Sequence, residues 1–330
     1  MMARKLSDQY GRVFDYARIA VTERCNLRCV YCMPESGVDF ARGARLLSSD
    51  EIIRLLQLLA VLGVRKFRFT GGEPLVRRDL LSLVEAAASL SAVEEVHLTT
   101  NGVLLGRKLS ELAAAGLTGV NISIDTLRED RYRSITRRNG LQEALVALRS
   151  AVDVLPVVKV NVVAMRGFND DEFVDFARLA QQLPITIRFI ELMPFDASQV
   201  WNSGRFVGTH QIKASLLNVW PELEAVGGTA TESWTARIPG GVGKVAVIPA
   251  FTRSLCSDCN RIRITADGKL RNCLYSESEY SLREPMRAGV PDEVLLNMLR
   301  RGVVEKARDG WAAQRASTSR FRISMTQIGG

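Results

Sequence analysis

Three cysteines near the amino terminus limit most strongly what this chain can fold into. Cys25, Cys29 and Cys32 stand in the segment VTERCNLRCVYCMP, with three residues between the first two cysteines and two between the last two. This spacing allows one loop to wrap one metal cluster, and thiolates are the ligands that hold iron–sulfur clusters. Three thiolates on a four-iron cluster leave one iron open. The segment therefore predicts an iron–sulfur cluster that can bind a small molecule.

A structural zinc site is the alternative for this segment. Structural zinc takes four protein ligands, but no further Cys or His lies nearby, and the two histidines of the chain are His97 and His210. The other three cysteines form a second group, Cys256, Cys259 and Cys273. A cytosolic protein rarely uses disulfides, so two spaced groups of three indicate metal ligands.

Residues 17–193 alternate between short β-branched segments and segments with helical periodicity. Ser48 and Glu51 have the spacing of a capping box at the start of the clearest helix, and Gly63 marks its end. Six strand–helix alternations predict a parallel sheet, open or curled into a barrel. An antiparallel sheet with one wet face is the alternative, which the helical connections disfavour.

Each predicted strand has one apolar and one polar face, because strand side chains point alternately to opposite faces. The polar faces carry five cations, namely Arg18, Lys66, Arg68, Lys159 and Arg188. A closed barrel filled with apolar side chains would bury these cations, which is costly unless they are paired. A hollow partial barrel that holds a large anionic ligand removes the conflict. The net charge of +8 agrees with an anionic partner, although a solvated basic surface would give the same value.

Two further segments carry chemistry. The segment Thr70–Pro74, TGGEP, ends the second predicted strand, where glycines allow close approach of a ligand and Glu73 can accept from an ammonium group. The second cysteine group has the spacing C-x2-C-x13-C and again lacks an evident fourth ligand. A second three-cysteine cluster is predicted there, with zinc as the alternative. Arg261 and Arg263 follow it on one face of a strand, with Ile262 on the other.

The pattern changes after about residue 195. Residues 196–210 are expected to form a loop, and residues 211–330 mix a helix, strands near 243–248 and 261–265, and a helical segment at 293–307. We therefore expect two domains, 1–210 and 211–330. The amino-terminal segment MMARKLSDQYGRVFD has no apolar signal region, and no stretch of eighteen apolar residues is present. These features predict a cytoplasmic protein that does not enter a membrane.

The first cysteine group, with Tyr31 before its third cysteine, and the TGGEP segment resemble the motifs of the radical S-adenosylmethionine (SAM) superfamily. More narrowly, the chain resembles the GTP 3',8-cyclase family of molybdenum cofactor biosynthesis. The resemblance runs from residue 18 to the last residue and rests on these segments: RIAVTERCNLRCVYCMPE, KFRFTGGEPLVRRDL, LTTNG, NISID, VKVNVV, IRFIELM, CSDCNRIRIT, DGKLRNCL and the terminal Gly329-Gly330. The stretch around 195–245 matches less clearly.

The resemblance implies an α/β fold, a partial (βα)6 barrel of the radical-SAM kind, with a smaller carboxyl-terminal region that carries a second cluster. The implied cofactors are SAM and two [4Fe–4S] clusters, the first on Cys25, Cys29 and Cys32 and the second on Cys256, Cys259 and Cys273. The implied SAM contacts are Tyr31, Gly72, Ser123 and Met193. The implied GTP contacts are Arg18, Lys66, Arg68, Thr99, Lys159, Arg188, Arg261, Ile262 and Arg263. Catalytic roles are implied for Arg261, Arg263, Gly329 and Gly330, with the tail reaching into the active site.

The implied reaction is that of a lyase, which converts GTP to (8S)-3',8-cyclo-7,8-dihydroguanosine 5'-triphosphate. The implied partners are an electron donor, a downstream cyclic pyranopterin monophosphate synthase and a second copy of the chain, but neither nucleic acid nor membrane. Three other functions fit parts of the sequence. A radical-SAM peptide maturase would usually carry more cysteines at its carboxyl end. A tRNA-modifying enzyme would bind RNA with strong salt dependence, and a zinc-binding nucleic-acid module would have no catalysis.

Overall fold

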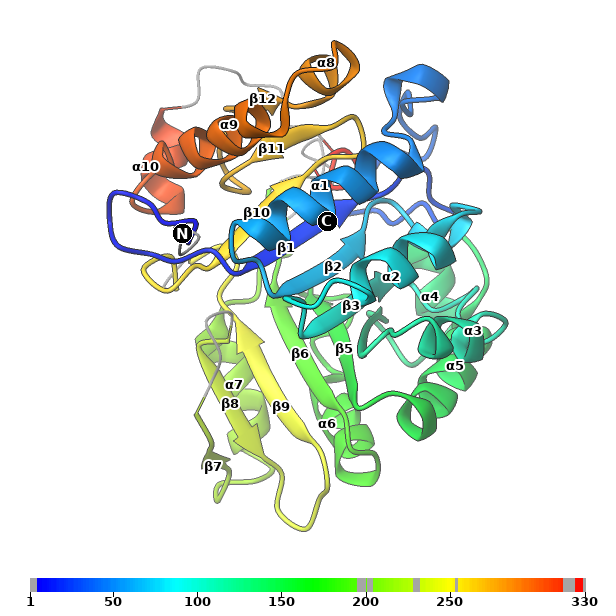
Figure 1. The fold of residues 1–330 in the computed structure, drawn as a ribbon. Coiled ribbons are helices and arrows are strands. Elements are labelled where there is room, and N and C mark those ends of the chain that lie inside the picture. The colour runs from blue at the N-terminus through cyan, green and yellow to red at the C-terminus, as the bar shows by residue number, and fades with distance from the viewer. Residues whose placement is uncertain are drawn as a thin grey trace.

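A single curved sheet organises the molecule (Figure 1). The computed structural model describes residues 5–194, 200, 204–227, 232–252, 255–316 and 324–328 of the chain. The first six strands of the sheet are β1 (Tyr16–Ala20), β2 (Lys66–Thr70), β3 (Glu95–Thr100), β4 (Gly119–Ser123), β5 (Val157–Ala164) and β6 (Thr186–Glu191). The later strands are β7 (Glu224–Ala225), β8 (Trp234–Arg237), β9 (Lys244–Ile248), β10 (Arg261–Ile264), β11 (Lys269–Arg271) and β12 (Tyr280–Ser281).

The sheet is parallel through its centre and antiparallel at both ends. Its strand order is β12-β11-β10-β1-β2-β3-β4-β5-β6-β9-β8-β7, and every pairing from β10 through to β9 is parallel. The predicted partial barrel is therefore confirmed, and the antiparallel alternative is wrong for the first six strands. Strands β9 and β10 lie far apart in the sequence from the strands they pair with, which are β6 and β1.

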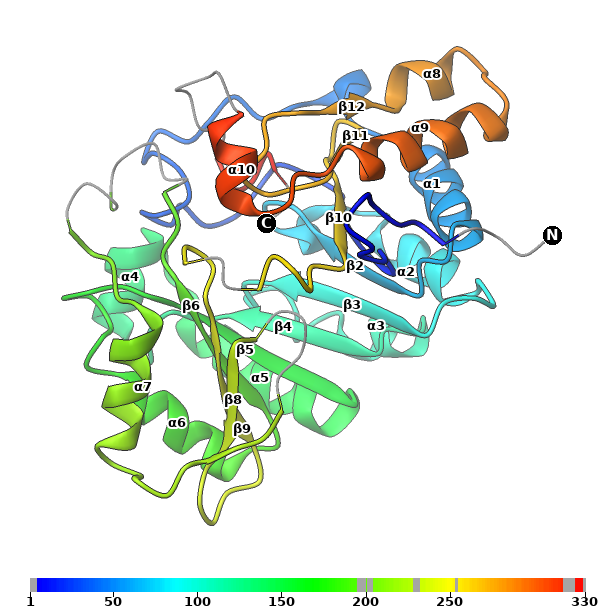
Figure 2. The same ribbon diagram turned by 90° about the vertical axis from the view of Figure 1, so that its left-hand side faces the viewer.

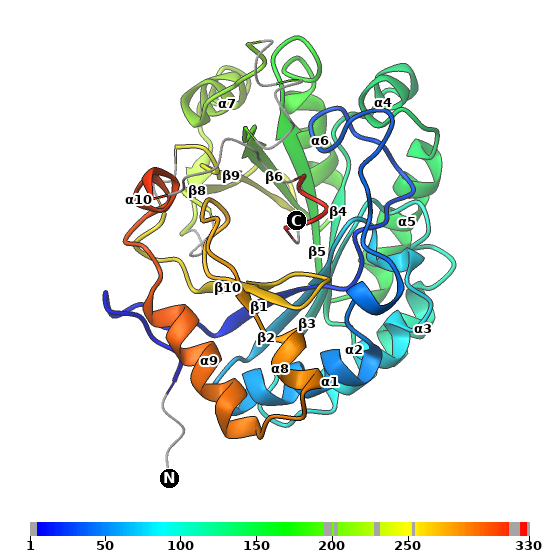
Figure 3. The same cartoon turned by 90° about the horizontal axis from the view of Figure 1, so that it is seen from above.

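Helices cover the outer, convex face of the sheet (Figure 3). The longer helices are α1 (Ser49–Val61), α2 (Leu80–Ala88), α5 (Leu141–Val154), α6 (Phe173–Gln182), α7 (Thr209–Leu217) and α9 (Asp292–Val304). The shorter helices are α3 (Leu109–Ala114), α4 (Glu129–Thr136), α8 (Arg283–Arg287), α10 (Gly310–Arg315) and the 3-10 turns Gly43–Arg45 and Pro74–Val76. None of the helices in the described part of the chain is long and apolar enough to cross a bilayer.

The apolar strand faces pack under these helices, as the alternating pattern predicts. Ile19, Phe67, Ile122, Val160 and Phe189 are all fully buried in one hydrophobic core. Burying a large apolar side chain contributes about 1.5–3 kcal/mol, so this face holds the sheet and the helices together. The opposite face is left to polar side chains, and it lines the inside of the curve.

The predicted capping box of the first helix is present. Ser48 Oγ accepts from the Glu51 backbone N–H at 3.2 Å, and the Glu51 carboxylate accepts from the Ser48 N–H at 2.8 Å. Gly63 follows the helix end with φ +89°, a conformation that glycine adopts without strain. The helix is thus fixed at both ends by its local sequence.

The carboxyl-terminal region shares the main sheet and also contacts the amino-terminal segment. Arg12, in that segment, donates to the carbonyl oxygens of Cys256 and Arg308 at 2.9 Å each and of Ala307 at 2.7 Å. Figure 2 shows α9 and α10 on the side of the sheet where β10 and β11 lie. Strands from the two sides of residue 210 pair with each other in one sheet, as β6 does with β9 and β1 with β10. The sheet therefore shows no division at this position, and the domain boundary near residue 210 stays a prediction. Of the loop predicted for residues 196–210, residues 196–199 and 201–203 lie outside the described residues, and the last two residues already belong to α7, which begins at Thr209.

Candidate active site

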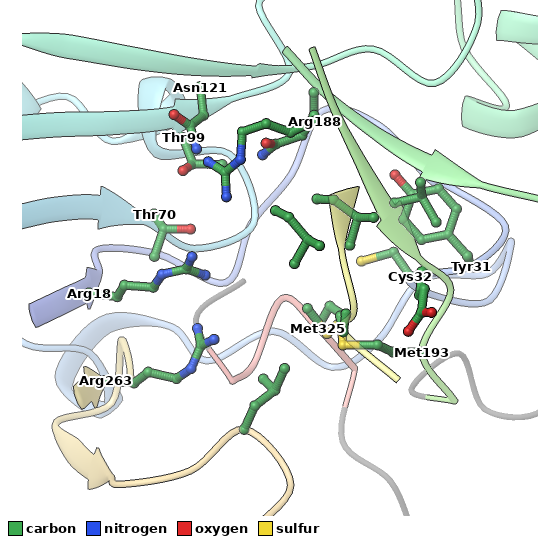
Figure 4. Close-up of a pocket in the computed structure, with 18 of the residues that line it drawn as sticks. Arg18, Tyr31, Cys32, Thr70, Thr99, Asn121, Arg188, Met193, Arg263 and Met325 are labelled. Atoms are coloured by element: carbon green, nitrogen blue, oxygen red, sulfur yellow. The ribbon is translucent and has the colours of Figure 1, made fainter. Parts of the chain in front are cut away.

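A cavity of about 340 Å³ lies within the curve of the sheet. Its lining includes residues at the carboxyl ends of the parallel strands, such as Thr70, Thr100 and Ser123, where ligands bind in folds of this kind. All six cysteines line it. Figure 4 shows Arg18 and Arg263 pointing into the cavity from one side, with Tyr31, Cys32 and Met193 on the opposite side. One cavity therefore joins the two cysteine groups to a cationic wall.

The first cysteine group lies in a tight loop after β1. The Cys32 N–H donates to the Cys29 carbonyl at 2.9 Å, which closes a turn between these two cysteines. Arg137, at the end of α4 with φ +56°, donates to the carbonyl oxygens of Arg28 and Met33 at 3.0 and 3.1 Å and so holds the loop from outside. Helix α4 thus fixes the shape of the cysteine loop.

Burial raises the pKa of Cys25 to about 12 and that of Cys32 to about 11, and it raises the pKa of Cys29 well above its usual value. The polypeptide alone therefore does not favour three thiolates here, whereas a bound metal cluster would supply the missing positive charge. The donor set of three thiols around one loop fits an iron–sulfur cluster with an open iron.

The glycines of the TGGEP segment allow β2 to lie directly against the cysteine loop. The Gly72 N–H donates to the Thr22 carbonyl at 2.9 Å, and the Glu73 N–H donates to the Arg24 carbonyl at 2.8 Å. A Cβ on Gly71 would lie 2.2 Å from the Thr22 oxygen, and a Cβ on Gly72 would lie 2.4 Å from the Arg24 oxygen. Any larger residue would push β2 away from the loop, so the sequence requires glycine at both positions.

Replacing Gly71 with alanine is expected to reduce the free energy of unfolding by about 3 kcal/mol or more, because the added methyl group meets backbone atoms and φ is +140°. Chemical denaturation measures the effect. The control is Gly106→Ala, since nothing lies within 4 Å of a Cβ at Gly106, and this variant should keep its stability within about 0.5 kcal/mol. Equal stabilities of the two variants would contradict this account.

Glu73 has a different position from the one expected. It is only 1% exposed and does not line the cavity. Its carboxylate accepts from Thr100 Oγ1 at 2.8 Å and from the backbone N–H groups of Asn101 and Leu75 at 2.7 and 3.1 Å. Burial raises the pKa of Glu73 to about 7, although these hydrogen bonds act in the opposite direction. Glu73 therefore ties β2 to the end of β3.

The four residues expected to contact SAM, Tyr31, Gly72, Ser123 and Met193, all line the cavity. The Tyr31 hydroxyl donates to Asp125 Oδ2 at 2.7 Å, and Asp125 Oδ1 accepts from the Val163 N–H at 2.8 Å. Burial raises the pKa of Asp125 to about 6. Asp125 thus fixes the tyrosine ring beside the cysteine loop, a role that the sequence did not assign.

Cations stand side by side on neighbouring strands of the polar face. In the register of the sheet, Arg18 of β1 is the direct partner of Arg263 on β10 and of Arg68 on β2. Like charges directly opposite each other destabilise a sheet, and all three side chains are partly or fully buried. Such a row concentrates positive charge on the wall of the cavity, where an anionic ligand would be favoured.

The residues expected to contact GTP fall into two sets. Those that line the cavity are Arg18, Thr99, Arg188, Arg261 and Arg263. Those that are not among its lining residues are Lys66, Arg68, Lys159 and Ile262. Ile262 is fully buried in the hydrophobic core on the other face of β10, so only its main chain is available to a ligand.

Arg68 does not line the cavity itself but contacts Thr99, which does. It donates to Thr99 Oγ1 at 3.3 Å and to His97 Nδ1 at 2.9 Å. His97 Nε2 lies 2.8 Å from the Glu95 carboxylate, which also pairs with Lys66. Burial lowers the pKa of His97 to about 4, so its ring is neutral at physiological pH and Nδ1 can accept from Arg68. The buried histidine therefore orients this arginine.

Tyr16 lies at the base of the cation row. Its hydroxyl accepts from Arg18 Nε at 3.3 Å, and Arg18, Lys66 and Arg68 lie 5.6–5.8 Å from the centre of its ring. Burial alone would raise the pKa of Tyr16, but Arg18, Arg68 and Arg261 lower it to about 6. The phenol therefore offers the cations a partial internal counter-charge.

The second cysteine group has a more positive environment than the first. Lys306 donates to Cys259 Sγ at 3.2 Å and to the Arg261 carbonyl at 3.0 Å, and the Gly310 N–H donates to Cys256 Sγ at 3.3 Å. Burial raises the pKa of Cys259, but Lys306 and Arg261 outweigh it and lower the pKa to about 6. Within the described ranges, no three His, Cys, Asp or Glu side chains lie close enough to bind a single metal ion.

The carboxyl-terminal tail also reaches the cavity. Ser324 Oγ donates to the Cys32 carbonyl at 2.7 Å, and Met325 and Thr326 line the cavity. The segment 324–328, red in Figure 3, lies inside the curve of the sheet. Gly329 and Gly330, for which catalytic roles were expected, lie outside the described residues.

Sequence reasoning missed several residues at this site: Tyr16, Glu232, Lys306 and Met325, and the role of Asp125. Tyr16 shares its strand face with Arg18, two residues away, so the alternating pattern could have found it. Glu232 lies in the stretch that resembled no motif. Lys306 follows helix α9, and nothing in the local sequence connects it with the cysteines.

Two family models match most of the chain. The model of the Radical SAM superfamily matches residues 19–180, and the model named Molybdenum Cofactor Synthesis C matches residues 185–310. Together they include the strands β2–β12, the last two residues of β1, and all six cysteines.

Several curated proteins are similar over nearly the whole chain. A GTP 3',8-cyclase of Chlorobaculum tepidum is 42% identical over 98% of this chain and 97% of its own length. A GTP 3',8-cyclase of Moorella thermoacetica is 44% identical, with 98% and 100% covered. The human molybdenum cofactor biosynthesis protein 1 is 43% identical over 92% of this chain, which spans 48% of that longer protein.

Solved structures share the fold at low sequence identity. The structure of Streptococcus suis SuiB bound to S-adenosylmethionine aligns with a TM-score of 0.62 and 13% identity, covering 88% of this chain and 68% of that one. SuiB bound to its precursor peptide SuiA aligns with a TM-score of 0.63 and 14% identity, covering 96% and 76%. These likenesses concern the fold alone.

Proposed function

Because the chain belongs to the GTP 3',8-cyclase family of radical SAM enzymes in molybdenum cofactor biosynthesis, we propose a specific division of roles within its cavity. As a member of that family it is a lyase that uses SAM and an iron–sulfur cluster. The proposal assigns the first cysteine group and SAM to one end, the second cysteine group to another, and GTP to the space between them. One observation carries it: both groups and the arginine row line the same cavity.

Cys25, Cys29 and Cys32 hold the first cluster, and Tyr31, Gly72, Ser123 and Met193 contact SAM. The contacts of Tyr31 with Asp125 and of Gly72 with Thr22 support this assignment, since they fix the ring and the strand end next to the cysteines. A cluster with one open iron, when reduced and bound to SAM, supplies a carbon-centred radical that can abstract hydrogen from a substrate.

Arg18, Thr99, Arg188, Arg261 and Arg263 contact GTP directly. Charge supports this proposal, because adjacent arginines on neighbouring strands favour an anion and a triphosphate provides several negative charges. Lys66, Arg68 and Lys159 lie behind this wall, where they position the residues that line the cavity and add to its positive electrostatic potential. Ile262 acts through its main chain.

A second [4Fe–4S] cluster is held by Cys256, Cys259 and Cys273. The hydrogen bonds from Lys306 and Gly310 support it, because donors to sulfur favour the thiolate form that binds iron. Arg261 stands two residues after Cys259, at the start of β10, so it is placed to contact both the cluster and a guanine bound beside it. Arg261, Arg263, Gly329 and Gly330 complete the catalytic residues.

The protein's own contribution is positioning. The arginines fix the triphosphate, so the ribose C3' is held at one place relative to the radical source, and the base is held relative to the ribose. Residues 324–328 lie over the first cysteine loop and help to exclude water from the cavity. Arg68, oriented by His97, keeps Thr99 directed into the cavity.

The proposal extends to domains, partners and location. Residues 1–210 and 211–330 are the two functional regions, although their strands share one sheet. The product passes to a cyclic pyranopterin monophosphate synthase, an electron donor reduces the cluster, and two copies of the chain form a dimer. The enzyme works in the cytoplasm, without a nucleic-acid partner.

An isotope experiment tests the assignment of substrate and position. The anaerobically reconstituted enzyme receives dithionite, SAM and one of the four ribonucleoside triphosphates. Only GTP should give a cyclised nucleotide, and deuterium at C3' of GTP should appear in 5'-deoxyadenosine. If SAM is cleaved without any change in the nucleotides, or if deuterium never leaves C3', the proposed geometry is wrong.

A further inference from the structure

Glu232 places a carboxylate among the cations of the polar face. Its Oε1 lies 3.6 Å from Lys159 Nζ and 3.3 Å from Arg188 Nε, and the residue is only 5% exposed. Glu232 comes just before β8, whereas Lys159 and Arg188 lie on β5 and β6. An acidic side chain from the carboxyl-terminal region thus reaches two residues that are proposed to act on the substrate.

The contact between Glu232 and Arg188 is an ion pair without a directed hydrogen bond. Counting partners among the described residues, neither Glu232 Oε1 nor Arg188 Nε has a hydrogen bond with acceptable geometry. Glu232 Oε2 has only a long contact with Thr235 Oγ1, at 3.4 Å. Charge attraction without directed bonds is easier to break than a bidentate arginine–carboxylate pair. The carboxylate is therefore held by charge and can be replaced by another anion.

A triphosphate is a stronger partner for these cations than one carboxylate. It carries several negative charges, and each of its phosphates can accept from more than one donor. Arg188 lines the cavity, and Lys159 lies on the adjacent strand β5, two residues before Asn161, which is the direct partner of Arg188. A nucleotide whose phosphates reach Arg188 would meet the negative charge of Glu232 at short range, which is unfavourable in a buried site.

We propose that Glu232 is a competing carboxylate for the phosphate site, which pairs with Lys159 and Arg188 in the nucleotide-free enzyme and yields them to the triphosphate when GTP binds. This inference rests on the proposed function, because it takes those two cations as part of the GTP site. Glu232 then limits the affinity for any polyphosphate in the cavity.

A limited affinity for polyphosphate has a functional consequence in this reaction. Ring closure joins C3' to C8 and leaves the triphosphate unchanged, so the cations that bind the substrate bind the product equally well. Interactions that stabilise substrate, transition state and product alike do not speed the chemical step. A carboxylate that takes back two of the cations weakens the hold on the product and speeds its release.

Isothermal titration of the reconstituted, SAM-bound enzyme tests the proposal with Glu232→Gln, which keeps the shape and removes the charge. The variant should bind GTP about tenfold more tightly, and it should also bind inorganic tripolyphosphate more tightly. Its affinity for guanosine should not change. Stopped-flow measurement of GTP dissociation should give a slower rate in the variant.

The matched control is Glu279→Gln. Glu279 also pairs with two cations of the carboxyl-terminal region, Lys269 and Arg271, but neither of these cations lines the cavity, whereas Arg188, a partner of Glu232, does. This variant should bind GTP as the wild type does. If Glu232→Gln does not fold, Glu232→Asp withdraws the carboxylate by one methylene and should give a smaller gain in affinity.

Unchanged or weaker binding of GTP and tripolyphosphate by both Glu232 variants would overturn the proposal, because it would mean that Glu232 orients the cations and does not compete for them. A failure of the proposed function looks different. GTP would then bind neither the wild type nor the variant, while tripolyphosphate would still bind the variant more tightly, which would support the competition on its own.

Discussion

Replacing Cys25 with serine is expected to reduce the formation of 5'-deoxyadenosine from SAM to background. Serine is a poor iron ligand, and two remaining thiolates do not hold a four-iron cluster with an open position. The measurement is mass spectrometry of the anaerobic reaction with dithionite and SAM. The iron content should fall to roughly half of the wild-type value, because the proposed second cluster has its own ligands.

The overall fold of this variant should be intact, since the hydrogen bonds of the Cys25 thiol within the described part of the chain are with its neighbours Asn26 and Leu27. Circular dichroism checks this point. SAM cleavage at the wild-type rate would show that Cys25 is not a ligand, and the assignment of the first cysteine group would then be withdrawn.

The second large effect is expected from Cys256→Ser. This variant should keep a substantial part of the SAM cleavage but lose the cyclised GTP product, because the first cysteine group is untouched and the second can no longer hold the cluster proposed to lie beside the substrate. Both products are measured in the same reaction. The two cysteine variants are thus controls for each other, since one should lose both products and the other only one.

A neighbouring substitution separates loss of the ligand from damage to the loop. Ser257 is exposed and stands next to Cys256, so Ser257→Ala should retain both SAM cleavage and cyclisation. Full product formation by Cys256→Ser would remove the second cluster from the site. Loss of product in both variants would mean that the loop itself, and not the thiolate, is required.

The alternating strand pattern was enough to predict which face of each strand turns toward the cavity. Arg18, Thr99 and Arg188 face inward because side chains on a strand point alternately to the two faces, and the core accepts only the apolar set. Burial of Ile19 and Phe189 on the other face settles the orientation of their strands. The capping box at Ser48 was equally visible, because it depends on residues within one turn.

The register between distant strands could not be predicted. Nothing near Arg18 indicates that Arg263 will be its direct neighbour, because that pairing depends on where β10 joins the sheet. The same holds for the contact of Lys306 with Cys259 and for the carboxylate of Glu232. These contacts join segments that are far apart in the sequence, and only the folded sheet brings them together.

Some residues that the sequence predicts to contact a ligand do not line the cavity. Lys66 and Arg68 stand on the polar face as predicted, but Glu95 and His97 hold them behind the cavity wall. Glu73 was expected to contact a ligand, but its carboxylate instead accepts hydrogen bonds from Thr100 and Asn101 within the protein. The alternating pattern predicts on which face of the sheet a side chain lies. How far that side chain reaches into the cavity depends on its neighbours across the sheet.

The pairing of β1 with β10 has a consequence for folding during synthesis on the ribosome. Strand β1 is among the first segments to emerge, yet one of its edges has no partner until β10 is made roughly 240 residues later, about ten to fifty seconds at usual rates of synthesis. An unpaired edge can pair with other chains. Folding of this protein therefore includes a long interval in which its first strand must be protected, and we expect chaperone dependence to be greatest for chains that stop before β10.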